Sequence, residues 1–162
     1  MRIVEEKIYQ FHELEESAKE SARDWWRNTT DYPFHDENIK SIKAFCGHFG
    51  ITLKDWAIYG RGEHLTTNAE NCHFRGFTLA KAKELADRGY FPESGLWLDG
   101  TMIHSFYENF KKTGDALYAF QQALESALCS ITEDIDYQFS NEAVDEMLTI
   151  NEYEFTENGK RY

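Results

Sequence analysis

The residues best suited to chemistry are two close Cys/His pairs, Cys46-x-His48 and Cys72-His73. A structural zinc site takes four thiolate or imidazole ligands, usually as two spaced pairs, so these side chains match the required number. Cys72 and His73 are adjacent, however, and neighbouring residues on a strand point to opposite faces. The same geometry would keep His73 from activating Cys72 as a nucleophile. We therefore predict neither a metal site nor a catalytic pair here.

A second candidate for metal-assisted chemistry is His104 with Glu108, one helical turn further along the chain. Two ligands do not define a metal site. Cys129 adjoins an apolar stripe and, like Cys46, is predicted to fill the core. The chain has neither a G-x-S-x-G motif nor a phosphate-binding P-loop. The sequence thus predicts a protein without catalytic residues, metal or cofactor, and leaves a metal-assisted enzyme as an alternative.

The charge distribution is the more informative feature. The net charge is −12, and the segment 113–159 holds 11 acidic residues with no Lys or Arg. Such a segment would repel phosphates, so direct binding to nucleic acid or to an anionic membrane surface is not expected. A basic protein surface is the partner that this charge favours.

The candidate partner-binding residues follow from this bias. Acidic residues of the segment that fall off the apolar stripe are predicted to face solvent, where spaced carboxylates can imitate backbone phosphates. Trp25 and Trp26 are adjacent on a predicted helix, so one of them can stay accessible and anchor an interface. The acidic candidates are Glu125, Glu133, Asp134, Asp136, Glu142, Asp145 and Glu146.

The elements that must position these residues follow from hydrophobic periodicity. Strands are predicted over 2–11, 51–59, 71–77 and 152–157, with a turn at 60–62. Helices are predicted over 13–27, 36–49, 78–88 and 102–112, then after Gly114 through Ile135, and finally in a short segment that Asn141 caps. The long helix carries an apolar stripe, and the short helix is predicted to bury three residues. The stripe is Leu117, Phe120, Leu124, Leu128, Ile131 and Ile135, and the three residues are Val144, Met147 and Leu148.

Both element types, with strands at both ends, predict an α+β fold in which a small antiparallel sheet packs against several helices. The length of 162 residues fits a single domain over 1–162. Three cysteines cannot all pair, which favours a reducing cytoplasm. No apolar run reaches the length of a membrane span, and the N-terminal residues show no signal peptide, so a cytoplasmic protein is expected.

Three local patterns carry a resemblance. They are the opening Lys7-x-Tyr9-x-Phe11-x-Glu13-Leu14-x-Glu16-x-Ala18-Lys19-x-x-Ala22-Arg23-x-Trp25, a glycine-bearing hairpin near 58–77, and the close Asn151-Glu152-Tyr153-Glu154-Phe155-Thr156-Glu157-Asn158-Gly159-Lys160-Arg161-Tyr162. Together they resemble a group of small phage and prophage proteins, some of which are labelled antitoxins. The resemblance implies a phage or mobile-element origin and supplies no catalytic residues.

Two functions of the binding type are therefore expected. The first is a phage-encoded accessory protein that binds a basic host protein in the bacterial cytoplasm. Its most concrete form is a counter-defence inhibitor, anti-CRISPR or anti-restriction, that presents a nucleic-acid-mimicking surface to a nucleic-acid-binding complex. The alternative is an antitoxin that neutralises a cognate toxin.

Overall fold

The computed structural model describes residues 6–58, 63–92, 94 and 97–162. Its fold is α+β, as predicted, with helices dominant and the strands short. The chain divides into two compact units, which we describe separately. The terminal unit comprises Met1–Pro33 with Ile135–Tyr162, and the central unit comprises Phe34–Asp134. The assignment of residues 1–162 to a single domain stays a prediction.

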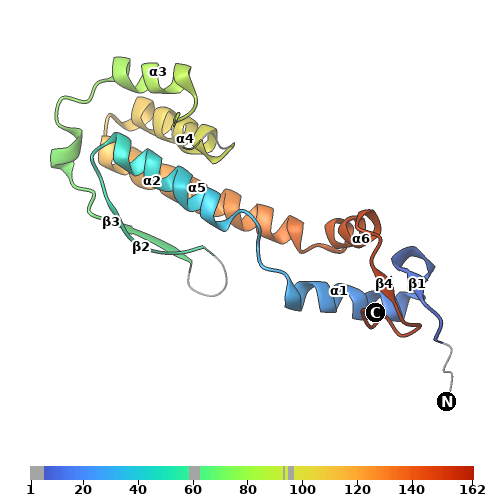
Figure 1. Cartoon of the computed structure of the whole chain (residues 1–162). Helices are drawn as coiled ribbons and strands as arrows, with labels where there is room; N and C mark the ends of the chain where they lie inside the picture. Colours follow the sequence, from blue (N-terminus) through green and yellow to red (C-terminus); the bar gives the residue numbers. More distant parts are fainter. Residues whose placement is uncertain (1–5, 59–62, 93, 95–96) are drawn as a thin grey trace. The chain divides into compact units, whose positions relative to one another are not determined.

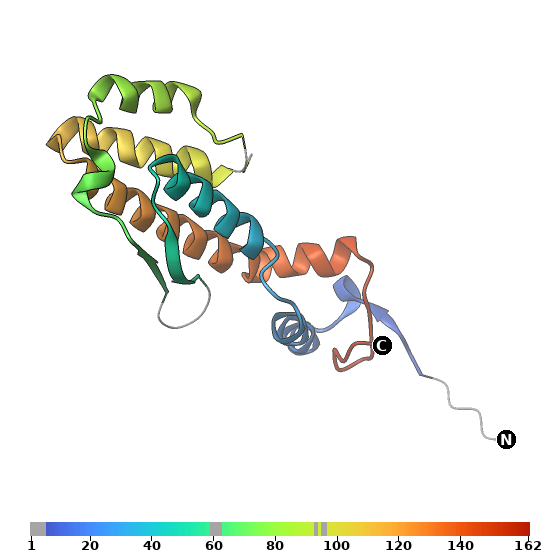
Figure 2. The same cartoon turned by 60° about the vertical axis from the view of Figure 1, so that its left-hand side comes forward.

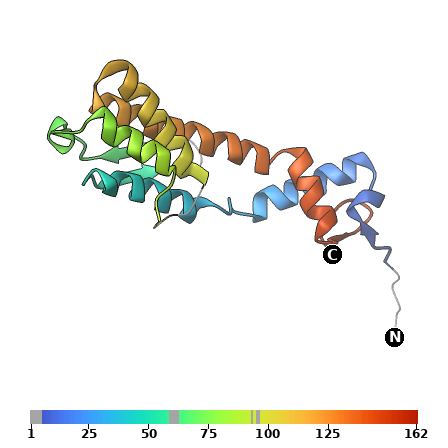
Figure 3. The ribbon, with the colours of Figure 1, turned by 90° about the horizontal axis from the view of Figure 1, so that it is seen from above.

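The terminal unit joins the two ends of the chain. Its elements are β1 (Tyr9–Gln10), a 3-10 turn at Phe11–Glu13, α1 (Glu16–Thr29), α6 (Asn141–Ile150) and β4 (Glu154–Phe155). The strands pair antiparallel, with Tyr9 opposite Phe155, and α6 crosses α1 (Figure 3). A small core fills the space between these elements: Phe11, Leu14, Ala18, Ala22, Val144, Leu148 and Phe155.

Two local features fix this unit. Ser140, rather than the predicted Asn141, caps α6, and its hydroxyl accepts a hydrogen bond from the Ala143 amide at 3.3 Å. The turn that follows β4 lies directly on the backbone of α1. A Cβ added to Gly159 would stand 2.0 Å from the carbonyl oxygen of Ala18, and the φ of Gly159 is +79°. Only glycine meets both conditions.

The central unit is a helical layer with one hairpin. Its elements are α2 (His35–His48), β2 (Leu53–Ala57), β3 (His64–Thr67), a 3-10 turn at Asn71–Phe74, α3 (Leu79–Arg88), α4 (Trp97–Thr113) and α5 (Ala116–Gln138), the last of which continues into the terminal unit. Helix α4 lies between α3 and α5 (Figures 1 and 2).

Phenylalanines form the centre of the central unit. The ring of Phe45 stacks on Phe120 with centroids 5.3 Å apart, and the edges of Phe49, Phe91 and Phe106 contact it. The predicted α5 stripe is largely confirmed. Phe120, Leu124, Ile131 and Ile135 are buried, whereas Leu117 and Leu128 are half-buried.

A buried carboxylate ties a loop to this core. Asp99 is fully buried and accepts hydrogen bonds from the hydroxyls of Ser41 and Ser94 and, at 2.8 Å, from the Phe91 amide. Three donors compensate the loss of water around a buried charge. Asp99 therefore fixes the segment before α4 against α2.

Three expectations about the elements change. The described strands form two separate two-stranded sheets, β1–β4 and β2–β3. The strand predicted over 71–77 is wrong, because the partner of β2 is His64–Thr67 and a 3-10 turn occupies Asn71–Phe74. Helix α4 begins at Trp97 rather than at residue 102. The predicted turn at 60–62 and the start of the predicted strand 2–11 lie outside the described residues.

Candidate functional site

The structure divides the predicted acidic set between the two units. Glu125, Glu133 and Asp134 lie on α5 in the central unit. The last turn of α5 carries Asp136, and α6 carries Glu142, Asp145 and Glu146, all in the terminal unit. The terminal unit therefore has an acidic group of its own, on α6 and at the end of α5.

Asp145 differs from the other acids of this group because it pairs with a buried arginine. Arg23 is only 5% exposed, and its Nε and Nη2 donate to Asp145 Oδ1 and Oδ2 at 2.6 and 2.8 Å. Its Nη1 donates to Glu16 at 2.7 Å and also to Glu20. These hydrogen bonds, that of Asp145 first, raise the pKa of the Arg23 guanidinium far above its usual value despite burial. Asp145 thus has a structural role, and a base from the other end of the chain neutralises part of the acidic segment.

A second arginine supports the start of α6. Arg27 donates from Nε to the Phe139 carbonyl at 3.0 Å and from Nη2 to the side chain of Asn141. Arg23 and Arg27 lie four residues apart on α1, so they share one face of that helix. This face holds α6 in place, and the opposite side of α6 is left for solvent.

The solvent side of α6 combines charge with apolar area. Glu142 and Glu146 are exposed, and in the described parts of the chain neither they nor Asp136 form an ion pair. Met147 is 40% exposed and Ile150 is 67% exposed. The expectation that Met147 is buried is therefore wrong. We call Glu142, Glu146, Met147 and Ile150 the α6 face.

Trp25 and Trp26 are half-buried in an aromatic cluster of the terminal unit. The Tyr153 ring lies 5.5 Å from Trp25 and 5.7 Å from Trp26, edge to face. The Arg161 guanidinium covers the Tyr153 ring at 4.8 Å. Packing is thus the first role of both tryptophans, and only part of each ring is accessible to a partner.

The structure changes the prediction for Cys72, His73 and Cys129 and confirms the burial of Cys46. Because Cys72 and His73 lie on a 3-10 turn rather than a strand, the Cys72 Sγ and His73 Nδ1 atoms are 3.7 Å apart, and their predicted separation on opposite faces is wrong. Cys46 is buried as predicted, and burial raises the pKa of its thiol to about 12, so it is no nucleophile at neutral pH. Cys129 is exposed instead of buried.

Within the described residues, no three His, Cys, Asp or Glu side chains converge as metal ligands. Glu108, which forms the second candidate pair with His104, lies 3.9 Å from the Lys111 ammonium.

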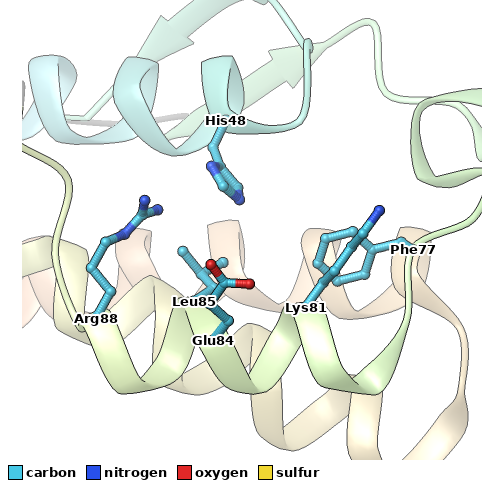
Figure 4. A pocket seen from close by; sticks show the side chains of 6 residues that line it. All are labelled: His48, Phe77, Lys81, Glu84, Leu85 and Arg88. Carbon is cyan, nitrogen blue, oxygen red and sulfur yellow. The ribbon is translucent and has the colours of Figure 1, made fainter.

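The central unit contains a pocket that the sequence analysis missed. Its volume is about 320 Å³, and its lining comes from α2, α3 and the segment before α3: His48, Phe77, Lys81, Glu84, Leu85 and Arg88 (Figure 4). The available signal was the spacing of Lys81, Leu85 and Arg88, which places all three on one side of α3.

Comparisons with family models, with curated proteins and with solved structures find no match to this chain. Among the described residues, none of the helices has both the length and the apolar character that a membrane span requires.

Proposed function

We propose that this protein acts by stoichiometric binding to a basic protein and that the α6 face is its contact surface. One observation carries the proposal. The α6 face presents two acids that form no ion pair with any described residue, beside two exposed apolar side chains, on a helix whose other side is fixed by Arg23 and Arg27. A rigid helix with both kinds of side chain is suited to binding a protein surface.

The two kinds of side chain contribute differently to such a complex. Exposed acids raise the association rate with a basic partner and select against acidic ones. Met147 and Ile150 supply apolar area, which stabilises the complex once it has formed. Trp25 and Trp26 contribute through their accessible edges. Direct binding to nucleic acid or to a membrane is no part of this proposal, because the acids would repel both.

The biological setting of the proposal rests on the resemblance to phage and prophage proteins. A phage protein that binds a basic host protein in the bacterial cytoplasm acts as an accessory factor. The most concrete form is an inhibitor of a nucleic-acid-binding defence complex, in which spaced carboxylates take the place of phosphates. An antitoxin would use the same surface against a basic toxin.

The test begins with capture of partners on the tagged protein from a defence-bearing bacterial lysate, followed by mass spectrometry. We expect a basic, nucleic-acid-binding protein whose binding weakens as salt rises and is competed by nucleic acid. Glu142→Gln with Glu146→Gln should slow association at least about tenfold. Met147→Ser with Ile150→Ser should speed dissociation instead.

A matched control is Glu125→Gln with Glu133→Gln, because these exposed acids lie on α5 in the central unit. This variant should bind as the wild type does. Binding that is insensitive to salt and to both α6 double variants, or that weakens as much in the α5 control as in the α6 variants, would overturn the proposal. Capture of a toxin encoded beside this gene would replace the counter-defence form by the antitoxin form.

A further inference from the structure

We infer that the pocket between α2 and α3 of the central unit is a binding site for a small organic monoanion, a carboxylate on an aromatic or branched apolar body. The inference is independent of the α6 face, since all residues of the pocket lie in the central unit. Figure 4 shows His48 reaching from α2 toward Glu84 and Leu85 on α3, with Arg88 and Lys81 at the two ends of the pocket.

The floor of the pocket is apolar. Leu85 is 3% exposed, and Phe77 is half-buried against the rings of Phe49, Phe106 and Phe110. These neighbours hold Phe77 in place, so the floor exists before any ligand binds. A volume of about 320 Å³ falls at the small end of the range for ligand pockets. It fits a single ring or a branched chain.

The rim carries two bases and one acid, Lys81, Arg88 and Glu84. Among the described residues, neither Lys81 nor Arg88 forms an ion pair. The Lys81 ammonium reaches only the Gly76 carbonyl, at 3.4 Å, and the Arg88 guanidinium lies over the Phe91 ring at 5.4 Å. In a protein of net charge −12, two exposed bases that border a pocket and form no ion pair with the described residues are candidates for binding an anion.

The same helix provides a contrast. Lys83 projects from another side of α3, where its ammonium pairs with Asp87 at 2.7 Å. The hydrogen bond that the Lys83 ammonium donates to Asp87 raises the pKa of Lys83. A lysine on α3 can therefore form an ion pair within the helix. On the pocket side, Lys81 and Arg88 form no such pair with the described residues.

The charge of the rim selects the ligand class. Lys81 and Arg88 carry two positive charges, and Glu84 carries one negative charge, so one anionic group balances the rim. A guanidinium binds a carboxylate through two parallel hydrogen bonds. A second hollow, of about 410 Å³, also includes His48 and Arg88 in its lining and gives the head group access to Arg88 from solvent. The apolar body then lies over Phe77 and Leu85.

The experiment uses the full chain and four probes, with binding followed by amide chemical-shift changes in NMR spectra. The probes are 3-phenylpropionate, 3-phenylpropanol, 3-phenylpropylamine and acetate. We expect saturable shifts at Phe77, Lys81, Leu85 and Arg88 with 3-phenylpropionate. The alcohol and acetate should bind at least about tenfold more weakly, because each lacks either the charge or the apolar body. The amine should not bind.

Variants test the rim. Arg88→Gln should weaken 3-phenylpropionate binding about tenfold or more, and Lys81→Gln should weaken it several-fold. Lys83→Gln, the matched control, removes one positive charge from the same helix and should leave binding unchanged. Shifts confined to residues outside the pocket, no saturable binding at millimolar probe, equal binding of the alcohol, or equal losses in Lys83→Gln and Arg88→Gln would each overturn the assignment.

Discussion

The two units differ in how they use charge. The terminal unit has 15 acidic and 7 basic residues, whereas the central unit, which is longer, has 14 acidic and 10 basic residues. In the terminal unit a buried arginine binds three carboxylates, and the outer acids of α6 form no ion pair within the described parts of the chain. In the central unit the side chain of the buried Asp99 accepts hydrogen bonds from two hydroxyls and an amide, and two bases that form no ion pair with any described residue border a pocket.

The difference shows that net charge alone does not locate a binding surface. Both units are acidic overall, yet the α6 face of the terminal unit presents acids, whereas the pocket of the central unit is bordered by two bases. Which charged side chains remain available to a partner depends on which of them form ion pairs and hydrogen bonds within the fold. The acids that Arg23 engages are thereby committed to the fold of the terminal unit. This is why we assign a basic partner to the terminal unit and a small anion to the central unit.

The largest expected effect concerns the aromatic core of the central unit. Phe45→Ala removes a fully buried ring that contacts four other phenylalanines, and should lower the free energy of unfolding by about 3–5 kcal/mol. Urea denaturation measures this loss. The control is Tyr90→Ala, at an exposed ring, which should change stability by less than about 0.5 kcal/mol.

Cys46 provides a probe specific to the central unit. The thiol lies in the same core as Phe45, and its pKa of about 12 leaves almost no thiolate at neutral pH. Thiol reagents should modify Cys72 and Cys129 rapidly and Cys46 only on opening of the unit, and Phe45→Ala should accelerate the slow reaction. Fast labelling of Cys46 in the wild type would contradict the burial on which both expectations rest.

In the terminal unit the most sensitive position is a glycine. Gly159→Ala places a methyl group against the Ala18 carbonyl and should cost about 2–4 kcal/mol, since the turn must move off α1. Hydrogen exchange of the α1 and α6 amides measures the loss. The matched control is Gly114→Ala in the central unit, where φ is also positive, +70°, but no atom lies within 4 Å of the added Cβ. That variant should cost only about 1–2 kcal/mol, from backbone strain. Equal losses would mean that the contact with Ala18 contributes nothing.

The ion cluster around the buried Arg23 should contribute somewhat less to the free energy of unfolding. Arg23→Met leaves three carboxylates together without a cation and should destabilise the protein by about 2–3 kcal/mol, below the range for fully buried pairs because the acids keep contact with water. Lys83→Met breaks an exposed pair and should cost less than about 0.5 kcal/mol. Thermal unfolding compares the two. A loss in Arg23→Met as small as that in Lys83→Met would show that the cluster does not hold α6 on α1.

The sequence predicts the helices well because their signals are local. Thr78 begins α3 as expected, accepting a hydrogen bond from the Lys81 amide at 3.4 Å, and Gly89 ends it at a positive φ of 72°. The strand at 71–77 was wrong because the short, mostly polar run His64–Thr67 carries little strand signal, although its exposure does alternate along the chain. The start of α4 was placed too late because Gly100 lies inside its first turn, where it suggests a loop.

The candidate sites were less predictable because they depend on contacts that are distant in sequence. Arg23 and Asp145 are separated by 122 residues. The segment 113–159 taken alone therefore shows only acidic residues, although in the fold Arg23 neutralises Asp145. The pocket likewise needs α2 beside α3, and nothing in either helix alone predicts that His48 and Arg88 line the same pocket. Met147 is exposed because α6 buries only a narrow face, and hydrophobic periodicity does not predict the width of that face.

The smallest expected effect concerns the exposed pair of the β2–β3 hairpin, where His64 Nε2 lies 3.1 Å from Asp55 Oδ2. The hydrogen bond with His64, followed by that from the Trp56 amide at 3.0 Å, lowers the pKa of the Asp55 carboxyl below its ordinary value. A carboxyl whose pKa is lower in the folded state adds stability above its unfolded pKa of about 3.9 and loses that contribution as the pH falls through the folded value.

His64→Val should therefore raise the pKa of Asp55 toward its ordinary value, which a titration of the Asp55 side-chain carbonyl in NMR spectra measures directly. The same titration in urea should give one midpoint for both proteins, because the shift exists only in the folded hairpin. Since the pair is exposed, the variant should unfold almost as the wild type does at neutral pH. This sets the pair apart from the Arg23 cluster, in which the cation is buried. If the Asp55 midpoint stays depressed in His64→Val, the Trp56 amide alone causes the shift, and the histidine makes no contribution to the charge balance of the central unit.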